Sequence, residues 1–301
     1  MTADSSTNVL NYNSPAGLRA FLDANGLGMR KKYGQNFLIN PRTRQALVEA
    51  LGAGAGETVW EIGPGLGAMT RLLLDRGLVV DAFDIDPGFA AALRGFFASD
   101  SGFTLIEGDV MKTWQRQAVA EAPYLLGNLP YNIAAALLAD FIEKGRRFRR
   151  MVVTVQREVA LRMAARPGSA DYSSFSVLCA LAYTVKPLMV IQGASFYPRP
   201  RVDSQGVLLD ARPDTASGSL PPVFYSLLRC LFTSRRKMIK NNLTNFIAAR
   251  TGIEKPPLAA AALLEKAGLT GGERAENLEP EAFAALAKDI EDMRILQQEC
   301  Q

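Results

Sequence analysis

The chain has 301 residues, 48% of them hydrophobic and 21% charged, a composition typical of a folded globular protein rather than a disordered one. The net charge is +4 and there is no histidine, which excludes Ser-His-Asp and Cys-His nucleophilic schemes, histidine-ligated metals and imidazole bases. No apolar run approaches the ~18 residues of a membrane span, and the N-terminal sequence has no secretory or transit pattern, so we expect a cytoplasmic protein.

The first long stretch with a clear pattern is residues 58–86. It reads "TVWEI", "GPGLGA", "MTRLLLDRG" and "LVVDAFDID", which predicts a strand, a glycine loop, a helix and a second strand. Further strand candidates follow at "FTLIEGD", "YLLGN" and "MVVTVQ", with helical patterns over 87–98 and 132–144. This alternation predicts an α/β fold with a parallel sheet.

The later part of the chain has a different pattern. "TVKPLMVIQG" and "VDSQGVLLD" predict an antiparallel pair at the sheet edge. Residues 210–222, rich in Pro, Ser, Gly and Asp, predict a linker, and the stretches after it have helical spacing. We therefore expect an α/β domain over 1–212, with an N-terminal extension over about 1–29, and a small all-helical domain over 213–301.

The glycine loop "EIGPGLG" lies between a predicted strand and helix, where Gly63 and Gly65 allow a ligand to approach the backbone. The third glycine, Gly67, comes one residue too early for the dinucleotide pattern G-x-G-x-x-G, so a plain tight turn stays open. Asp84 follows at the end of the second strand, where an acid commonly accepts hydrogen bonds from ribose hydroxyls. Asp109 ends the third strand and is suited to an exocyclic amine, although a turn or helix-cap role is an alternative for both acids.

The fourth strand ends in "GNLPYN", at the same predicted sheet edge. A proline turn in which Asn128 bonds to its own backbone is one interpretation. In the functional interpretation, the Asn128 side chain and the Leu129 carbonyl accept both hydrogens of an amino group on a flat base. Pro130 then stiffens the turn and Tyr131 stacks on the base.

Nine motifs occur together in one order: "KKYGQNFLIN", "EIGPGLG", "FDID", "EGDVM", "GNLPYN", "VQREVALRM", "PRPRVDS", "RRKMIKNNL" and "RAENL". From about residue 30 to about residue 285, the chain resembles the small-subunit ribosomal RNA adenine N6-dimethyltransferases, the KsgA/Dim1 family. The resemblance implies a Rossmann-like methyltransferase domain with a small helical C-terminal domain, and S-adenosyl-L-methionine as the methyl donor. It also implies N6,N6-dimethylation of two adjacent adenosines in the 3′-terminal hairpin of 16S rRNA, in small-subunit biogenesis.

The resemblance also assigns site residues. The catalytic motif matches Asn128, Leu129, Pro130 and Tyr131. The donor-binding positions match Asn36, Leu38, Gly63, Gly65, Asp84, Ile85, Asp109, Val110 and Asn128. Two positions depart from the family's pattern: Asp84 stands where Glu is more usual, and Ser173 stands where glycine is usual, which puts the ribose geometry and the local loop conformation in doubt.

Two basic clusters are predicted to contact RNA phosphates, with a solvated charged surface as the alternative for each. The segment "KGRRFRR" supplies Arg146, Arg147, Arg149 and Arg150. The segment "SRRKMIK" supplies Arg235, Arg236, Lys237 and Lys240, which the helical spacing places within one helical segment.

The leading hypothesis is therefore an enzyme acting on the small ribosomal subunit as a monomer, without a metal ion or a membrane. Positioning of a poorly nucleophilic amine against a strong electrophile needs no histidine base, which fits the composition. The alternatives are a large-subunit rRNA adenine methyltransferase of the erythromycin-resistance type and a noncatalytic ribosome-assembly factor.

Overall fold

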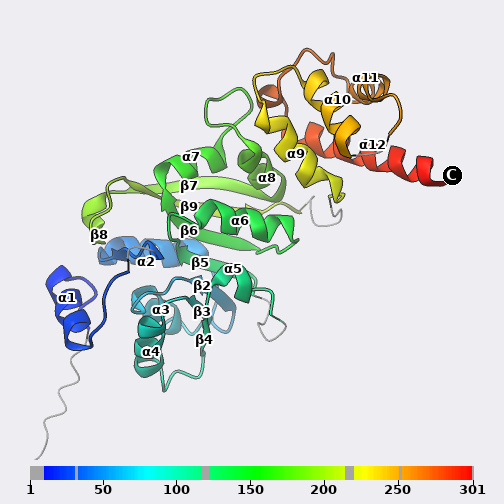
Figure 1. Ribbon diagram of the computed structural model, residues 1–301. Coiled ribbons are helices and arrows are strands. Elements are labelled where there is room, and N and C mark those ends of the chain that lie inside the picture. The colour runs from blue at the N-terminus through cyan, green and yellow to red at the C-terminus, as the bar shows by residue number, and fades with distance from the viewer. Residues whose placement is uncertain (1–9, 31–32, 117–121, 214–219, 251–252, 300–301) are drawn as a thin grey trace, which may run out of the picture. The chain divides into compact units, whose positions relative to one another are not determined.

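A computed structural model of the chain describes residues 10–30, 33–116, 122–213, 220–250 and 253–299 (Figure 1). The described residues form two compact units. The first takes its residues from 1–137, 148–160 and 186–210, and the second from 138–147, 161–185 and 211–301. Part of the predicted linker, residues 214–219, lies outside the described residues.

A mixed sheet of seven strands confirms the predicted α/β class. In spatial order its strands are β4 (Phe103–Glu107), β3 (Val79–Asp84), β2 (Thr58–Ile62), β5 (Tyr124–Asn128), β6 (Arg150–Gln156), β9 (Ser204–Ala211) and β7 (Tyr183–Ile191). The first five run parallel to one another, and β9 runs antiparallel to β6. The two strands predicted for the sheet edge, β9 and β7, are neighbours there.

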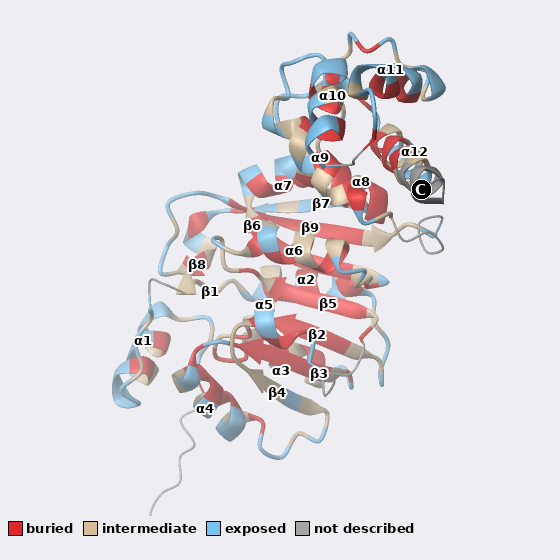
Figure 2. Ribbon diagram, turned by 45° about the vertical axis from the view of Figure 1, so that its right-hand side comes forward, coloured by how far each residue is buried: buried red, intermediate tan, exposed pale blue. Residues whose placement is uncertain are grey.

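The sequence of each strand explains its place in the sheet. Strands β5 and β6 are almost continuous apolar runs, as strands covered on both faces require, and their residues are buried except for Asn128, Arg150 and Gln156 at strand ends (Figure 2). Strand β7 lies at the edge and exposes its middle, where Lys186 and Pro187 occur. A charge and a proline at an edge discourage pairing with another chain.

The helices of the first unit precede or connect its strands. They are α1 (Pro15–Ala24), α2 (Pro41–Leu51), α3 (Ala68–Leu74), α4 (Pro87–Phe96) and α5 (Val110–Thr113), while α6 (Ala134–Glu143) and α7 (Arg157–Ala164) continue into the second unit. The predicted helices over 87–98 and 132–144 correspond to α4 and α6. Leu47 and Leu51 of α2 and Leu73 of α3 share a buried apolar cluster with Val59 and Val80 of the sheet. This cluster fixes both helices on one face of the sheet.

Two features of the topology position the site. Strand β2 lies between β3 and β5, so the strand order reverses there, and open α/β sheets bind ligands beyond the carboxyl ends of the strands at such a point. A separate two-stranded ladder pairs β1 (Phe37–Leu38) with β8 (Phe196–Tyr197). The "GQNFL" segment is therefore held by a strand from much later in the chain.

The second unit is helical. Besides parts of α6 and α7 it contains α8 (Ser174–Ala182), α9 (Val223–Thr233), α10 (Ile239–Arg250), α11 (Pro256–Lys266) and α12 (Pro280–Glu299). Leu227, Leu231, Phe246, Leu263 and Phe283 are fully or almost fully buried. Apolar residues at spacings of three and four explain how these helices bury one face each.

One helix prediction is wrong. Residues 234–238 form the connection between α9 and α10, so Arg235, Arg236 and Lys237 lie outside any helix and only Lys240 lies within one. The side-chain amide of Asn242 donates to the carbonyls of Leu231 and Ser234 at 3.4 and 3.1 Å. These bonds satisfy carbonyls that the end of α9 leaves without helical partners.

Candidate functional site

A glycine loop after β2 forms the first part of the site. Gly63 and Gly65 have φ angles of 69° and 61°, in the left-handed region that glycine adopts without steric cost. The N–H of Gly63 donates to the carbonyl of Phe83 on β3 at 3.0 Å. A Cβ placed on Gly63 would lie 3.8 Å from the backbone oxygen of Asn128. The loop after β2 thus lies directly beside the end of β5.

Glu61, just before this loop, is completely buried. The hydroxyl of Thr70 on α3 donates to its Oε2 atom at 2.6 Å, and its Oε1 atom has no hydrogen-bond partner among the described residues. Burial raises the pKa of Glu61 to about 7, and the nearby Asp84 adds to the rise. A half-satisfied buried carboxyl beside a loop is unusual, because buried polar atoms are normally paired.

Two acids end the next two strands. Asp84 is only 7% exposed and accepts from the N–H of Asp86 at 2.8 Å. Burial raises the pKa of Asp84 to about 7, and the carboxyl of Asp86 contributes to the same rise. Asp109 follows β4 and caps α5, since its Oδ1 atom accepts from the N–H of Met111 at 3.0 Å.

Asn128, at the end of β5, contacts a segment far away in sequence. Its Nδ2 group donates to the backbone carbonyl of Asn36 at 2.7 Å. Nδ2 can only donate, so Oδ1 is the acceptor of this side chain, and the bond to Asn36 fixes how the amide is oriented.

The other residues of the "NLPY" motif differ in accessibility. Leu129 is 1% exposed, and its N–H donates to the carbonyl of Thr154 on β6 at 3.0 Å. The Tyr131 hydroxyl lies 2.6 Å from Oγ of Ser204, and burial raises the pKa of this tyrosine. The motif is thus anchored to the sheet at two points.

The glycine loop, Asp84, Asp109 and Asn128 line one cavity. It encloses about 970 Å³, including space open to solvent. We call it the strand-end cavity and define it by its lining: Tyr12, Leu18, residues 33–38, Arg44, residues 62–66, Ala68, Met69, residues 83–85, Phe89, residues 108–110, Asn128, Pro130 and Ile133. All nine residues predicted to bind the donor are among them. Of the four predicted catalytic residues, Asn128 and Pro130 line the cavity, while Leu129 and Tyr131 are adjacent in the chain but are not part of the lining.

Sequence reasoning missed several residues of the lining, among them Tyr12, Leu18 and Arg44. Tyr12 and Leu18 belong to the N-terminal extension, and the Tyr12 hydroxyl donates to the carbonyl of Leu66 at 3.0 Å. Their sequence context carries no motif. Arg44 had a readable signal, since it shares a spacing of i, i+3, i+4 and i+7 with the apolar residues of α2 that are buried.

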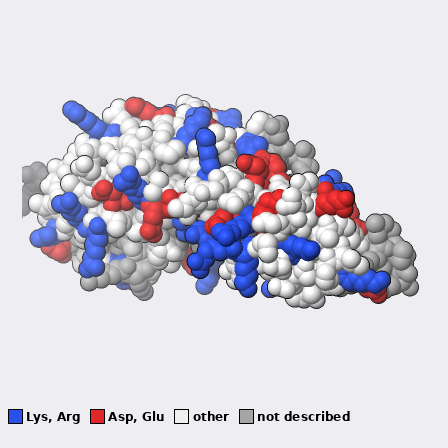
Figure 3. Space-filling model, turned by 90° about the horizontal axis from the view of Figure 1, so that it is seen from above, with Lys and Arg blue, Asp and Glu red and all other residues white. Residues whose placement is uncertain are grey.

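The first basic cluster is engaged within the chain. Arg149 forms an ion pair with Glu57 at 2.5 Å, and Arg150 forms one with Asp210 at 2.6 Å. Arg147 donates to the carbonyl of Ile142 at 2.9 Å, and Arg146 is half-buried. On the face that Figure 3 shows, acidic side chains likewise lie among the basic ones.

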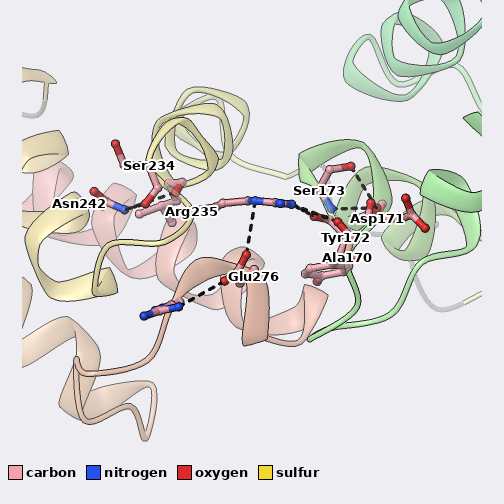
Figure 4. Close-up of polar contacts among 11 residues, drawn as sticks. Ala170, Asp171, Tyr172, Ser173, Ser234, Arg235, Asn242 and Glu276 are labelled. Carbon is pink, nitrogen blue, oxygen red and sulfur yellow. Dashed lines mark hydrogen bonds and ion pairs between the residues drawn. The ribbon is translucent and has the colours of Figure 1, made fainter. Parts of the chain in front are cut away.

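In the second cluster, Arg235 has several partners within the second unit (Figure 4). Its Nη1 group donates to the carbonyls of Ala170 and Tyr172 at 3.2 and 3.4 Å, and its Nε atom lies 3.4 Å from a carboxylate oxygen of Glu276. Arg236, Lys237 and Lys240 are exposed, and none of the three forms an ion pair with another described residue.

Ser173, the second departure from the family's pattern, lies beside the Arg235 contacts. Its φ of −152° is extended, so the backbone here does not require glycine. Its N–H donates to Oγ of Ser176 at 3.0 Å at the start of α8.

Neither a metal centre nor a membrane span is found in the described parts of the chain. No three acidic or cysteine side chains gather there in a way that would hold a metal ion. None of the helices in the same ranges is both long enough and apolar enough to cross a membrane.

Comparisons with known proteins identify the family. The model of the family described as "Ribosomal RNA adenine dimethylase" matches residues 26–290. The chain is 44% identical over 291 residues to "Ribosomal RNA small subunit methyltransferase A" of Treponema denticola, covering 93% of this chain and 96% of the relative.

Two solved structures share the fold. A dimethyladenosine transferase from Plasmodium falciparum matches with a TM-score of 0.71 and 24% identity, over 84% of this chain and 97% of that one. The 23S rRNA methyltransferase ErmE matches with a TM-score of 0.60 and 23% identity, over 84% and 99%. Together with the family match, these structures confirm the predicted Rossmann-like methyltransferase fold. The chain belongs to the ribosomal RNA adenine dimethylase family of S-adenosyl-L-methionine-dependent enzymes.

Proposed function

We propose that this enzyme dimethylates N6 of two adjacent adenosines in the 3′-terminal hairpin of 16S rRNA, during small-subunit biogenesis. The similarity to a small-subunit methyltransferase over most of both chains supports the small subunit over the large one. The fold alone does not separate the two, since ErmE shares it. We further propose that the protein acts as a cytoplasmic monomer without a metal ion.

The strand-end cavity fits the methyl donor. Its glycines at 63 and 65 leave the backbone open to a ligand, and Asp84 and Asp109 offer carboxylate oxygens to the ribose hydroxyls and the adenine amine. Ile85 is 41% exposed and lines the same cavity, so it offers an apolar surface to the adenine ring. Asp84 accepts directly from a neighbouring backbone N–H, so its shorter side chain is already held in place without the extra methylene of Glu.

The bond between Asn128 and Asn36 is the observation that carries the catalytic proposal. It leaves Oδ1 of Asn128 at the cavity as an acceptor, and the Leu129 carbonyl follows in the chain. We assign these two oxygens to the two hydrogens of the adenine N6 amine. Tyr131 stacks on the base in this proposal, with its hydroxyl held by Ser204.

The bound donor supplies an electrophilic methyl group on a sulfonium. The two acceptor oxygens orient the amine and stabilise the positive charge that develops on it, which is the kind of preorganised electrostatic help that a reaction of this type needs. The proton released from N6 passes to solvent, so the absence of histidine is no obstacle.

The RNA contacts and the domain division also remain proposals. We propose that Arg236, Lys237 and Lys240 bind phosphates, supported by their exposure and their lack of ion pairs with described residues. Arg146, Arg147, Arg149, Arg150 and Arg235 stay in the proposal with less support, because each of them already has partners in the chain. The all-helical domain over 213–301 is supported by the helices α9 to α12, although the compact second unit also includes 138–147 and 161–185.

Mass spectrometry of rRNA tests the proposed function. Small subunits from a dimethylation-deficient strain are incubated with the protein and S-adenosyl-L-methionine, and large subunits are treated in parallel. We expect two adjacent dimethyladenosines in the 3′-terminal hairpin of 16S rRNA. Modification of large-subunit RNA alone would support the resistance-type enzyme, and binding without any methylation would support an assembly factor.

A further inference from the structure

Arg44 is a charged residue in an apolar position. It lies on the face of α2 that also carries Leu47, Val48 and Leu51, all of them buried, and it is itself only 5% exposed. Arginine is rarely buried to this degree without an acidic partner. Its place at the strand-end cavity therefore calls for an explanation.

The guanidinium of Arg44 is only partly satisfied. Nη1 donates to the carbonyl of Leu38 at 2.6 Å and more weakly to that of Tyr12 at 3.4 Å, and Nη2 donates to Oδ1 of Asn13 at 2.5 Å. Nε is buried and has no hydrogen-bond partner among the described residues. All the recorded partners are neutral oxygens, and no carboxylate in the described ranges forms an ion pair with Arg44. Burial also lowers the pKa of this guanidinium.

An uncompensated buried charge is destabilising unless an opposite charge reaches it. Anchoring the N-terminal extension does not account for the charge, because the carbonyls of Tyr12 and Leu38 need only a neutral donor. Of the five guanidinium N–H groups, the buried one on Nε and the second one on Nη2 have no partner among the described residues. An anionic ligand that reaches the guanidinium from the cavity would compensate its charge, and a guanidinium matches a carboxylate particularly well.

The charged residues that line the cavity indicate which group of a ligand Arg44 would contact. Among the described residues that line it, Arg44 is the only lysine or arginine, whereas Asp84 and Asp109 are acidic. Arg44 contacts the Tyr12 and Leu38 part of the lining, and Tyr12 in turn bonds to Leu66 of the glycine loop. The cavity thus offers acids for the adenosine part of a ligand and one cation for a carboxylate.

We propose that Arg44 recognises the α-carboxylate of the methyl donor and thereby selects ligands that carry the intact amino-acid end. This inference rests on the proposed placement of the donor in the strand-end cavity. It adds a specificity residue from α2, an element outside the motifs that the sequence singled out.

Calorimetric titration of the full-length protein tests the inference without relying on activity. The two ligands are S-adenosyl-L-methionine and its decarboxylated analogue, which keeps the adenosine, sulfonium and amine. We expect the wild type to bind the intact donor at least about tenfold more tightly, the size of effect that one hydrogen bond to a charged group produces. Arg44→Met should reduce this preference to less than about threefold, mainly by weakening the intact donor.

Three further variants separate the possible causes of a lost preference for the intact methyl donor. Arg44→Gln keeps a neutral donor for the carbonyls of Leu38 and Tyr12, protects folding, and should lose the preference as Arg44→Met does. Asn13→Ala removes the Nη2 partner alone and should keep the wild-type preference. Asp84→Ala should weaken both ligands by a similar factor. The ratio of the two dissociation constants does not depend on the fraction of folded protein.

The outcomes are distinct. Equal binding of the two ligands by the wild type, or an unchanged preference in Arg44→Gln, would overturn the role of Arg44. No effect of Asp84→Ala on either ligand would instead overturn the proposed donor site, and the inference with it.

Discussion

The side-chain amide of Asn128 donates to the backbone carbonyl of Asn36 across 2.7 Å. This bond joins the end of β5 to the segment that forms one wall of the strand-end cavity. It also fixes which atom of the amide faces away as an acceptor, so the catalytic proposal and the proposed donor site depend on the same contact.

Replacing Asn128 should therefore separate catalysis from binding. We expect Asn128→Ala to reduce methyl transfer by about 100- to 1,000-fold, because a preorganised acceptor for the developing charge is lost. Binding to small subunits should stay within about twofold, since RNA affinity comes mainly from phosphate contacts. Incorporation of a labelled methyl group and filter binding measure the two effects. Asn132→Ala, at an exposed neighbouring position, is the matched control, and equal activity of the two variants would remove Asn128 from the catalytic role.

The raised pKa of Asp84 predicts a pH-dependent stability. In the unfolded chain this carboxyl has a pKa near 3.8, whereas burial raises it to about 7 in the folded protein. The folded state thus holds the proton more tightly, and the free energy of unfolding should fall as pH rises from about 4 to about 7, by at most about 1.4 kcal/mol per pH unit from this group.

Urea unfolding at a series of pH values measures this trend. Asp84→Asn should show a shallower fall than the wild type, while Glu61, with a pKa of about 7, retains its own contribution. Parallel curves for the two proteins would contradict the assignment. Donor affinity should have the opposite trend and rise through about pH 7, because the ionised Asp84 is the better acceptor for ribose hydroxyls.

Thr70 should be important for stability through Glu61. Thr70→Val keeps the shape but removes the hydroxyl that donates to Oε2, so the buried carboxyl loses its side-chain partner and keeps only the backbone hydrogen bond from residue 70. We expect a loss of about 1 to 3 kcal/mol in the free energy of unfolding, the cost of an unsatisfied buried polar group. Thr70→Ser keeps the hydroxyl and should lose clearly less. Chemical denaturation measures the free energy of unfolding of both variants. An equal loss in the two would indicate that Thr70 stabilises the protein through packing rather than through the hydrogen bond.

Arg235 and Arg236 are neighbours with different expected roles. Arg235→Met removes the bonds to the carbonyls of Ala170 and Tyr172 and the contact with Glu276, and we expect a destabilisation of about 1 kcal/mol. Arg236→Met, at an exposed position, should change stability by less than about 0.5 kcal/mol.

The same two variants should rank in the reverse order in RNA binding. Arg236→Met should weaken RNA affinity and reduce its salt dependence by about one phosphate contact, whereas Arg235→Met should have the smaller effect. A thermal-unfolding series and a salt titration of RNA binding measure both properties. The phosphate proposal would fail if Arg236→Met left the salt dependence unchanged.

The parts of the fold that the sequence predicted are those with a local signal. The apolar runs that became β2, β3 and β5 are bounded by Gly, Asp and Asn, so their ends were visible, and the parallel sheet then brought those ends together. Long-range partners have no such signal. Phe196 and Tyr197 pair with the "GQNFL" segment through backbone hydrogen bonds. Because any sequence can form such bonds, no pattern in either segment predicts this pairing.

In the candidate site too, the residues with a local sequence signal were predicted, and those placed by long-range contacts were not. Gly63, Asp84 and Asn128 lie at strand ends and were predicted, while Tyr12 reaches the cavity through a bond to Leu66 that depends on tertiary structure. The helical pattern across 223–250 missed the break at 234–238, because Asn242 stabilises the end of α9 from a position eight residues beyond Ser234. Arg44 is the instructive case: its place as a lone charge in an apolar stripe could be read from the sequence, but only the structure places it at the cavity.

The ladder between β1 and β8 has a consequence for synthesis of the protein. Residues 37–38 are made early, but their partners at 196–197 follow only after most of the sheet has been translated. A nascent chain that ends before β8 has the glycine loop and both acids, yet the wall over them lacks its second strand. We therefore expect the emerging protein to acquire its donor only late in translation, so that unfinished chains do not compete with finished enzyme for the methyl donor.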